Sequence, residues 1–385
     1  MRKAPHAHKD YPINDEEFAS RLESLRGVME AEALDAVITY GAHRDYQPAD
    51  LRYFARWYCV EEETAALLVP QQGPTVLLTD ASWDVERAGA EAYADSVKHA
   101  PDLGPALAQS LEHAVGMQGR VGIAGYKFFP APAYLAMTDG LPDCHFVDAS
   151  EITGRLRMVK SAAELNLMRQ ASRISDEGMR AGLDTIADGA TEQEVAAAAE
   201  SAIIAAGAET SFVTEMGAGP RTAYGTFLPG RRRLAEGDIA VLDCGARYYG
   251  YHGDMCRTVV VGDPSAAQER MLQAVETAVN ESIAAVRPGV TVGAIRDVAA
   301  AAIAEAGFGD NWWDAFMPHG NGTGQHEMPN AKEHPDVELQ EGMVLCIEPG
   351  ITLPDEGAVI IEQMIAVTRY GAEVLNKLPT NMWDR

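Results

Sequence analysis

Two apolar hairpins that each carry a pair of carboxylates constrain this chain more than any other feature. The first, VLDCGARYYGYHGDMCRTVVV, holds Asp243 and Asp254 on either side of Tyr-Tyr-Gly. The second, MVLCIEPGITLPDEGAVIIEQMIAV, holds Glu348 and Glu362 on either side of Pro-Asp-Glu-Gly. Apolar, β-branched runs around a turn are typical of strand pairs. If each hairpin folds about its middle, Asp243 lies opposite Asp254, and Glu348 lies opposite Glu362.

Carboxylates in such positions repel one another. Directly opposite residues on paired strands lie about 5 Å apart at Cβ. At that spacing two charges repel by roughly 3 kcal/mol at an effective dielectric constant near 20. A protein keeps this arrangement by protonating the acids or by binding cations. Four acids that converge with a histidine indicate oxygen-rich ligation of two divalent metal ions.

Composition narrows the class of protein. A chain of 385 residues suggests two domains, and 47% hydrophobic residues suffice for a large core. The net charge of -26 argues against nucleic acid or an anionic membrane as a partner. No apolar run approaches the ~20 residues of a membrane span, and the first residues lack the apolar segment of a signal peptide. Five cysteines without a CxxC pattern fit a cytoplasmic location.

The chain divides into two parts of different pattern. Residues 1–150 alternate helical periodicity, as in 15–32 and 103–116, with short apolar runs, which predicts an α/β domain without a phosphate-binding GxGxxG loop. Residues 151–385 form the second domain, which carries the acidic hairpins. Near its start Ser161 and Glu164 predict a capping box for a long helix.

A repeat of about 100 residues runs through the second domain. GATEQEVAAAAESAIIAAG and GVTVGAIRDVAAAAIAEAG both place a threonine before an Ala-rich helix and a glycine after it. Thr191 and Thr291 are candidate N-caps, and Gly207 and Gly307 are candidates for the residue after the helix. Because each copy leads into one acidic hairpin, we expect a duplicated helix-and-hairpin unit whose copies bring four carboxylates to one centre.

Two histidines precede the second hairpin in the glycine-rich segment MPHGNGTGQHEMP. Glycines let the backbone approach a ligand closely, and neutral imidazole is the commonest nitrogen ligand of catalytic metals. One of His319 and His326 could bind metal while the other donates a hydrogen bond to a developing oxyanion.

These motifs resemble the "pita-bread" family of creatinase, aminopeptidase P, prolidase and methionine aminopeptidase, and the resemblance covers nearly the whole chain. It implies an α+β protein: a C-terminal pita-bread catalytic domain, with duplicated helix-hairpin units, and an N-terminal creatinase-like α/β domain. It also implies two divalent ions (Mn, Co, Fe or Zn) and a homodimer. The implied metal ligands are Asp243, Asp254, His319, Glu348 and Glu362.

The resemblance also assigns roles. His319 and Glu348 would share one metal, Asp243 would serve the other, and Asp254 and Glu362 would bridge. The implied reaction is metal-assisted hydrolysis of an amide-like C–N bond in a short peptide or small polar compound, by a hydroxide that bridges the metals. Glu348 would carry the proton to the leaving nitrogen and His326 would stabilise the tetrahedral oxygen.

Three positions depart from the prolidase pattern near the substrate. Thr226 stands where prolidases carry a pocket histidine, and Asn330 and Ile360 stand where they carry arginines. Loss of these groups predicts weak binding of a free dipeptide carboxylate. Cys256 and Cys346 each lie two residues from an expected ligand. Their sequence positions are compatible with two roles, packing in the core or an influence on the metal site.

Three functional alternatives therefore remain at this point. The first is a dinuclear metallohydrolase of the creatinase/prolidase type that cleaves a peptide or a small non-peptide C–N compound. The second is another enzyme on the same scaffold, such as a creatinase-like amidinohydrolase or a dimethylsulfoniopropionate lyase; those lyases carry a DxD motif where this chain has Asp-Cys-Gly. The third is a binding protein without catalysis, against which the intact ligand set argues.

Overall fold

The computed structural model describes residues 11–42, 49–60, 63–211, 213–313 and 317–383. It divides into two compact units, Met1–Arg157 and Met158–Arg385. The division falls seven residues beyond the expected boundary because helix α6 (Ser150–Met158) packs Ile152 and Leu156 against the core of the first unit. Arg157 at its end also forms an ion pair with the buried Asp50 of that unit.

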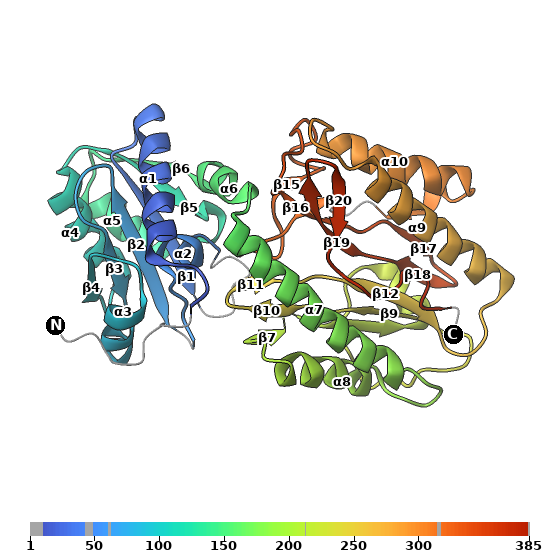
Figure 1. The fold of residues 1–385 in the computed structure, drawn as a ribbon. Coiled ribbons are helices and arrows are strands. Elements are labelled where there is room, and N and C mark those ends of the chain that lie inside the picture. The colour runs from blue at the N-terminus through green and yellow to red at the C-terminus, as the bar shows by residue number, and fades with distance from the viewer. Residues whose placement is uncertain (1–10, 43–48, 61–62, 212, 314–316, 384–385) are drawn as a thin grey trace. The chain divides into compact units, whose positions relative to one another are not determined.

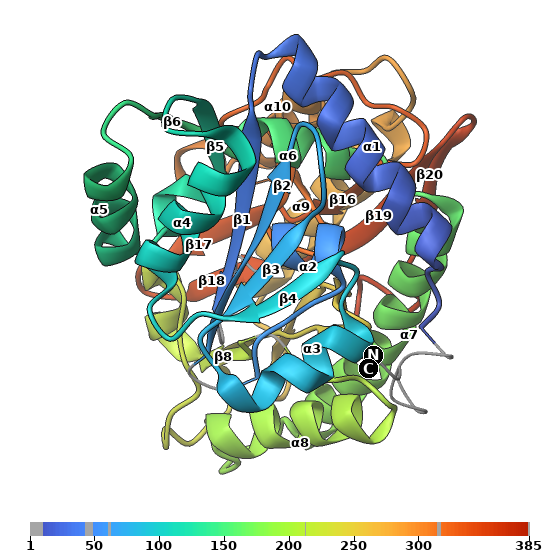
Figure 2. The same cartoon turned by 90° about the vertical axis from the view of Figure 1, so that its left-hand side faces the viewer.

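The first unit is a six-stranded mixed sheet with helices around it. The strand order is β4-β3-β2-β1-β5-β6, which Figure 2 shows face on. β1 pairs antiparallel with β2 and parallel with β5, so the sheet combines a meander with crossover connections through helices. The strands are β1 (Ala36–Ala42), β2 (Thr64–Pro70), β3 (Val76–Thr79), β4 (Ser96–His99), β5 (Arg120–Ala124) and β6 (His145–Asp148). The α-helices before α6 are α1 (Asp15–Ala31), α2 (Ala49–Ala55), α3 (Val85–Glu91), α4 (Leu103–Val115) and α5 (Ala131–Gly140).

The second unit contains two helix pairs, which Figure 1 shows in green and in orange. Helices α7 (Ala162–Thr185) and α8 (Glu192–Ala205) pack on each other, as do α9 (Ala266–Ala285) and α10 (Val292–Glu305). The expected caps are present. Ser161 and Glu164 form a capping box at the start of α7, and Thr191 and Thr291 cap α8 and α10. A side-chain cap of this kind stabilises a helix by about 1 kcal/mol.

Four sheets lie with these helices. Their strand orders are β11-β10-β7, β12-β9-β8, β13-β17-β18 and β15-β14-β16-β19-β20. The strands before α9 are β7 (Thr210–Ser211), β8 (Glu215–Ala218), β9 (Ile239–Asp243), β10 (Ala246–Tyr248), β11 (Tyr251–His252) and β12 (Cys256–Val260). Those after α10 are β13 (Trp312–Trp313), β14 (His319–Gly320), β15 (Glu327–Asn330), β16 (Val344–Ile347), β17 (Gly350–Leu353), β18 (Gly357–Ile360), β19 (Gln363–Thr368) and β20 (Gly371–Val374).

The repeat seen in the sequence recurs in the backbone hydrogen bonds. The Gly189 amide donates to the Leu234 carbonyl at 2.8 Å, and the Gly289 amide donates to the Leu339 carbonyl at 2.9 Å. Each bond ties the start of an Ala-rich helix to the segment just before an acid-bearing strand. Both copies therefore position their acids by the same local connection, and the predicted duplicated unit is present.

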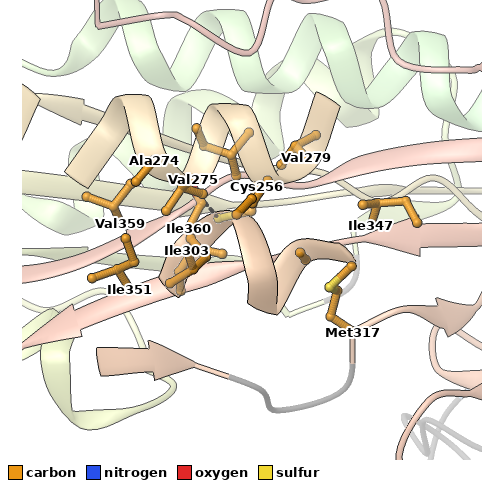
Figure 3. Packing of buried hydrophobic residues seen from close by; sticks show 14 of the residues in the cluster. Cys256, Ala274, Val275, Val279, Ile303, Met317, Ile347, Ile351, Val359 and Ile360 are labelled. Atoms are coloured by element: carbon orange, nitrogen blue, oxygen red, sulfur yellow. Dashed lines mark hydrogen bonds between the residues drawn. The ribbon is translucent and has the colours of Figure 1, made fainter. Parts of the chain in front are cut away.

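The larger core of the second unit lies between α9, α10 and the strands of both hairpins. Figure 3 shows Val275 and Val279 of α9 close to Ile360 and Cys256 from the strands. This apolar layer is continuous and holds the strand ends in place. In the part of the chain that the structure describes, no helix combines the length and the apolar character that crossing a membrane requires.

Candidate metal centre

The first hairpin folds one residue away from the expected middle. Tyr249 and Gly250 both have positive φ (49° and 81°) and form the two-residue turn between β10 and β11. This turn type needs two such residues, and glycine adopts positive φ without strain. The register pairs Asp243 with Cys256, so the expectation that Asp254 lies directly opposite Asp243 is wrong. Asp254 is offset by two residues, on the same face and diagonal to Asp243.

The second hairpin has the predicted register. Ile347 pairs with Gln363 and Gly350 pairs with Ile360, which sets Glu348 directly across from Glu362. The two hairpins meet at these acids, since the Glu362 amide donates to the Cys256 carbonyl at 3.0 Å. The hydroxyl of Thr258 adds a second link, because it donates to the Ile360 carbonyl at 2.7 Å.

Potential ligand atoms gather at this seam in two overlapping groups. In the first, one ligand atom from each residue lies within 4.8 Å of all the others. The same limit holds in the second, which shares Glu362 with the first. The first group consists of Asp254, His319, Cys346 and Glu362, and the second of Asp243, Glu348 and Glu362. All five residues proposed as ligands lie at this seam, but Glu348 lies with Asp243 and not with His319.

His319 is oriented as a metal ligand requires. Its Nδ1 lies 3.1 Å from the Gly320 carbonyl, which favours a proton on Nδ1 and leaves Nε2 as the lone-pair atom. Nε2 lies 3.8 Å from a Glu362 oxygen and has no hydrogen-bond partner among the described residues. Burial lowers the pKa of His319 to about 3, so the ring is neutral at physiological pH. A neutral imidazole whose lone pair faces carboxylates is ready to bind a cation.

The carboxyl groups of the centre form no ion pair with a described lysine or arginine. Burial is the main cause that raises the pKa of Asp254 to about 7 and those of Asp243, Glu348 and Glu362 well above their ordinary values. Among the residues described, the only buried carboxylate oxygens without a hydrogen-bond partner are Asp243 Oδ1, Asp254 Oδ1 and Glu362 Oε2. Buried charges of this kind are normally paired or bound to metal. The donor set therefore fits divalent cations.

Comparison with known proteins identifies the family. The family model described as "Metallopeptidase family M24" matches residues 166–369, which span both acidic hairpins. The chain belongs to metallopeptidase family M24. The "Creatinase/Prolidase N-terminal domain" model matches residues 21–159 of this M24 chain. The family expected from the sequence is confirmed.

Similar proteins and structures agree with this assignment. The M24 chain is 34% identical to the Xaa-Pro dipeptidase of Pyrococcus horikoshii over 233 residues, which is 60% of this chain and 66% of that protein, slightly under two thirds. The prolidase structure from the same organism has a TM-score of 0.84 at 26% identity, and covers 94% of this chain and 99% of that one. The structure of dipeptidase PepE of Mycobacterium ulcerans has a TM-score of 0.83 at 28% identity, and the match covers 96% of this chain and 98% of that one. The expected two-part, pita-bread fold is confirmed.

His326, which is expected to stabilise the tetrahedral oxygen, lies beside the proposed ligand His319. The rings of His319 and His326 are 4.4 Å apart between centroids and nearly perpendicular, at 88°. His326 is exposed, whereas His319 is buried. The surrounding protein nevertheless lowers the pKa of His326 by desolvation. An exposed, neutral imidazole next to a buried one is placed to contact a substrate that approaches the M24 centre.

The three expected pocket residues lie in different surroundings. Thr226 is exposed on the segment between β8 and β9. Asn330 ends β15, and its side-chain oxygen accepts hydrogen bonds from the amides of Lys332 and Glu333 at 3.1 and 2.8 Å. Ile360 is only 8% exposed and packs in the apolar core. None of the three supplies a cation, and their substrate role stays a prediction.

Sequence reasoning missed one polar neighbour of the M24 centre and named another, Asn321, only as a departure from the family pattern in the histidine segment. Glu215 on β8 pairs directly with Asp243, is half-buried, and forms no ion pair with a described basic side chain. The signal was a single acid in the short run TEMGA, without a second acid to mark it. Asn321 donates to Asp254 Oδ2 at 3.3 Å and to Cys346 Sγ at 3.6 Å. The sequence signal was a polar residue where the resembling family usually has an apolar one.

Proposed function

We propose that this chain is a dinuclear metal-dependent peptidase that acts on short peptides. One observation carries the proposal: three buried carboxylate oxygens without partners share one site with the lone pair of His319. Asp243, Asp254, His319, Glu348 and Glu362 would hold the ions. When bound, two divalent cations supply a polarised carbonyl and a water of lowered pKa.

The chain's own groups provide the remaining steps. Glu348 is positioned at the centre and only 8% exposed, so it can take a proton from the attacking water and deliver it to the leaving nitrogen. His326 can donate a hydrogen bond to the oxygen of the tetrahedral carbon as charge develops there. Since His326 is exposed and its neighbour His319 is buried, it serves the substrate and not the ions.

The charge of the pocket suggests which peptides are used. Relatives such as that of Pyrococcus horikoshii are named Xaa-Pro dipeptidases. This chain has Thr226, Asn330 and Ile360 in place of three groups expected to bind a free carboxylate, and its half-buried Glu215 lies beside Asp243. A charge-assisted hydrogen bond contributes about 1.5–3 kcal/mol. We therefore expect weak cleavage of Ala-Pro and Gly-Pro, and better cleavage of peptides whose carboxylate lies farther from the scissile bond.

A substrate panel tests this function. The protein loaded with Mn²⁺, Co²⁺, Fe²⁺ or Zn²⁺ is assayed with Xaa-Pro dipeptides, with longer peptides, with creatine-like compounds and with sulfonium acids. Turnover of peptides that chelation stops supports the proposal. Turnover of only the last two classes would replace it by an alternative that the comparisons do not favour. A kcat/KM above about 10⁴ M⁻¹s⁻¹ on Ala-Pro would refute the specificity argument alone.

Two further expectations complete the proposal. We expect a homodimer and a cytoplasmic location, both from the family resemblance and the cysteine pattern. Light scattering of the purified full chain measures the first, and fractionation of the source cells measures the second. A monomer at micromolar concentration contradicts the dimer.

A further inference from the structure

A buried ion pair connects the glycine-rich histidine segment to the start of helix α7. Lys160 directly precedes the N-cap residue of α7, and its Nζ lies 3.0 Å from Oε1 of Glu327. The two side chains are only 1% and 2% exposed. Such a pair is costly to form because both charges leave water, and it adds little net stability. Its place in the fold is therefore the better guide to its role.

The pair is built into a closely packed network with the backbone of this segment. The other carboxylate oxygen of Glu327 accepts a hydrogen bond from the Gly324 amide at 3.2 Å. A Cβ atom on Gly322 would lie 2.2 Å from Oε1 of Glu327, so only glycine fits there. The Gly322 carbonyl accepts in turn from the His252 amide at 2.9 Å. The segment is thus held by Lys160 and by the first acidic hairpin together.

His326 is the last residue of the loop that this network holds. Gly320 of β14 pairs with Glu327 of β15, so residues 321–326 connect the two strands. His319 lies on β14 and is set by the pairing of that strand with β16. His326 lies outside both strands and is exposed, whereas the side chain of its neighbour Glu327 is buried. The buried carboxylate therefore anchors the backbone from which the exposed imidazole projects.

We propose that Lys160 and Glu327 are positioning residues, which act by holding the His326 imidazole where it meets the substrate. This inference rests on the role of His326 in the proposed function. Neither Lys160 nor Glu327 belongs to a ligand group, so loss of the ion pair should leave the bound ions in place. The loss should instead appear in kcat, because His326 is expected to act on the transition state.

A double-mutant cycle tests whether the pair acts through His326. Metal-loaded wild type, Lys160→Met, His326→Ala and the double variant are assayed with one peptide. We expect Lys160→Met to lower kcat by about 10²-fold with KM and metal content unchanged, since a displacement near 1 Å can cost that much. In the His326→Ala background the same change should lower kcat by no more than about 2-fold. Equal losses in both backgrounds, or no loss in Lys160→Met, would overturn the proposal.

Arg169→Met is a matched control on the helix that follows Lys160. Arg169 forms two hydrogen bonds with Glu373, at 2.8 and 2.7 Å, but both side chains are more than a third exposed. An exposed ion pair contributes little. We therefore expect wild-type kcat and KM in this variant. A loss as large as that of Lys160→Met would show that turnover responds to any ion pair near α7, and would overturn the proposal.

A second variant covers the case in which Lys160→Met does not fold. Lys160→Met combined with Glu327→Gln removes both charges, and neutral groups often replace a buried pair without loss of stability. Hydrogen exchange measured by mass spectrometry then follows residues 319–328 without an activity assay. We expect faster exchange in this segment, including the Gly324 amide, and wild-type exchange in α9 and α10. Wild-type exchange throughout would overturn the proposal.

The two measurements separate this inference from the proposed function. If the metal-loaded wild type cleaves no peptide, the proposed function fails, and hydrogen exchange alone decides whether the ion pair holds the segment. If the wild type is active and the losses in Lys160→Met and His326→Ala multiply, only the positioning role fails.

Discussion

Buried acids occur in both units, but the two units neutralise them differently. In the first unit Asp84 is 6% exposed and forms a two-bond pair with Arg87, with both distances 2.8 Å. Asp50, equally buried, pairs with Arg157. Glu63 accepts hydrogen bonds from the Val60 amide and the Trp83 indole. Each of these acids receives donors from its own unit.

At the metal centre of the second unit, no lysine or arginine among the described residues forms an ion pair with the acids, and the nearest basic group is His319 at 3.8 Å from Glu362. Asp243, Asp254 and Glu362 each keep one buried oxygen without any partner among the described residues. Elsewhere in the same unit buried acids are satisfied; Asp176, for example, accepts from the Lys377 and Leu378 amides. This difference distinguishes acids such as Asp84 and Asp176, whose partners lie within the protein, from the acids of the centre, which we propose bind cations. A buried oxygen without a hydrogen-bond partner, more than burial alone, distinguishes these acids from the others.

Metal removal should produce the largest difference between the units. Chelation with EDTA is expected to abolish peptidase activity, because the carboxylate oxygens without a hydrogen-bond partner lose the cations that balance their charge. Binding at 100 times the dissociation constant stabilises a protein by about 2.7 kcal/mol per site. Calorimetry should therefore show the second unit melting at lower temperature after chelation. An unchanged melting profile would contradict the claim that the acids of the second unit need bound metal.

Asp254→Ala should lower the metal content directly. Asp254 belongs to the group around His319 and is proposed to bridge, so its loss should remove at least one ion per chain. Plasma mass spectrometry on purified protein measures this. Retention of the full wild-type metal content would show that the ligand assignment is wrong.

Arg157→Met should lower the stability of the first unit and leave the metal content unchanged, in contrast to Asp254→Ala. Breaking a buried ion pair typically costs about 3–5 kcal/mol, because the remaining charge stays buried and unpaired. The first unit should melt earlier, while metal content stays at the wild-type value. Denaturant unfolding and metal analysis on one preparation check both halves. Loss of metal in this variant would mean that the two kinds of acid are not independent.

His326→Ala should lower the turnover rate without lowering the metal content. Loss of a hydrogen-bond donor to a developing oxyanion costs about 10²–10³ in kcat. Since His326 is not among the ligand groups, the ions should remain. Steady-state kinetics together with metal analysis provide the measurement. Wild-type turnover in a metal-replete variant would remove His326 from the mechanism.

The smallest expected effect is a pH dependence confined to metal-free protein. The folded state raises the pKa of Asp254 from 3.8 to about 7, so it binds a proton that the unfolded chain releases. Its contribution to stability is complete below pH 3.8 and is lost as pH rises through about 7. Melting temperatures of chelated protein should fall over this range, and bound metal should cancel the trend. A rise with pH in the chelated protein would contradict the assignment.

The sequence predicted the duplication and the direct pairing of Glu348 with Glu362, because turn residues and strand periodicity are local signals. The sequence-based register placed Asp254 two residues away from its position in the structure. The reason is that Tyr249 adopts a positive φ, which a tyrosine in the sequence does not predict. Glu215 could not be found, because it reaches Asp243 from a strand whose pairing depends on tertiary contacts. The grouping of Cys346 with His319 likewise depends on how β14 aligns with β16.

The shared connection between each Ala-rich helix and its acid-bearing strand has a consequence for assembly. Each repeat is held together by its own hydrogen bonds, such as those of Gly189 and Gly289, yet supplies only part of the ligands. The centre therefore belongs to the junction of the repeats and to neither alone. If the chain were cut between β12 and α9, each fragment would carry part of the ligand set. Metal binding would then favour association of the two fragments, so the ion would stabilise the assembled domain in addition to serving catalysis.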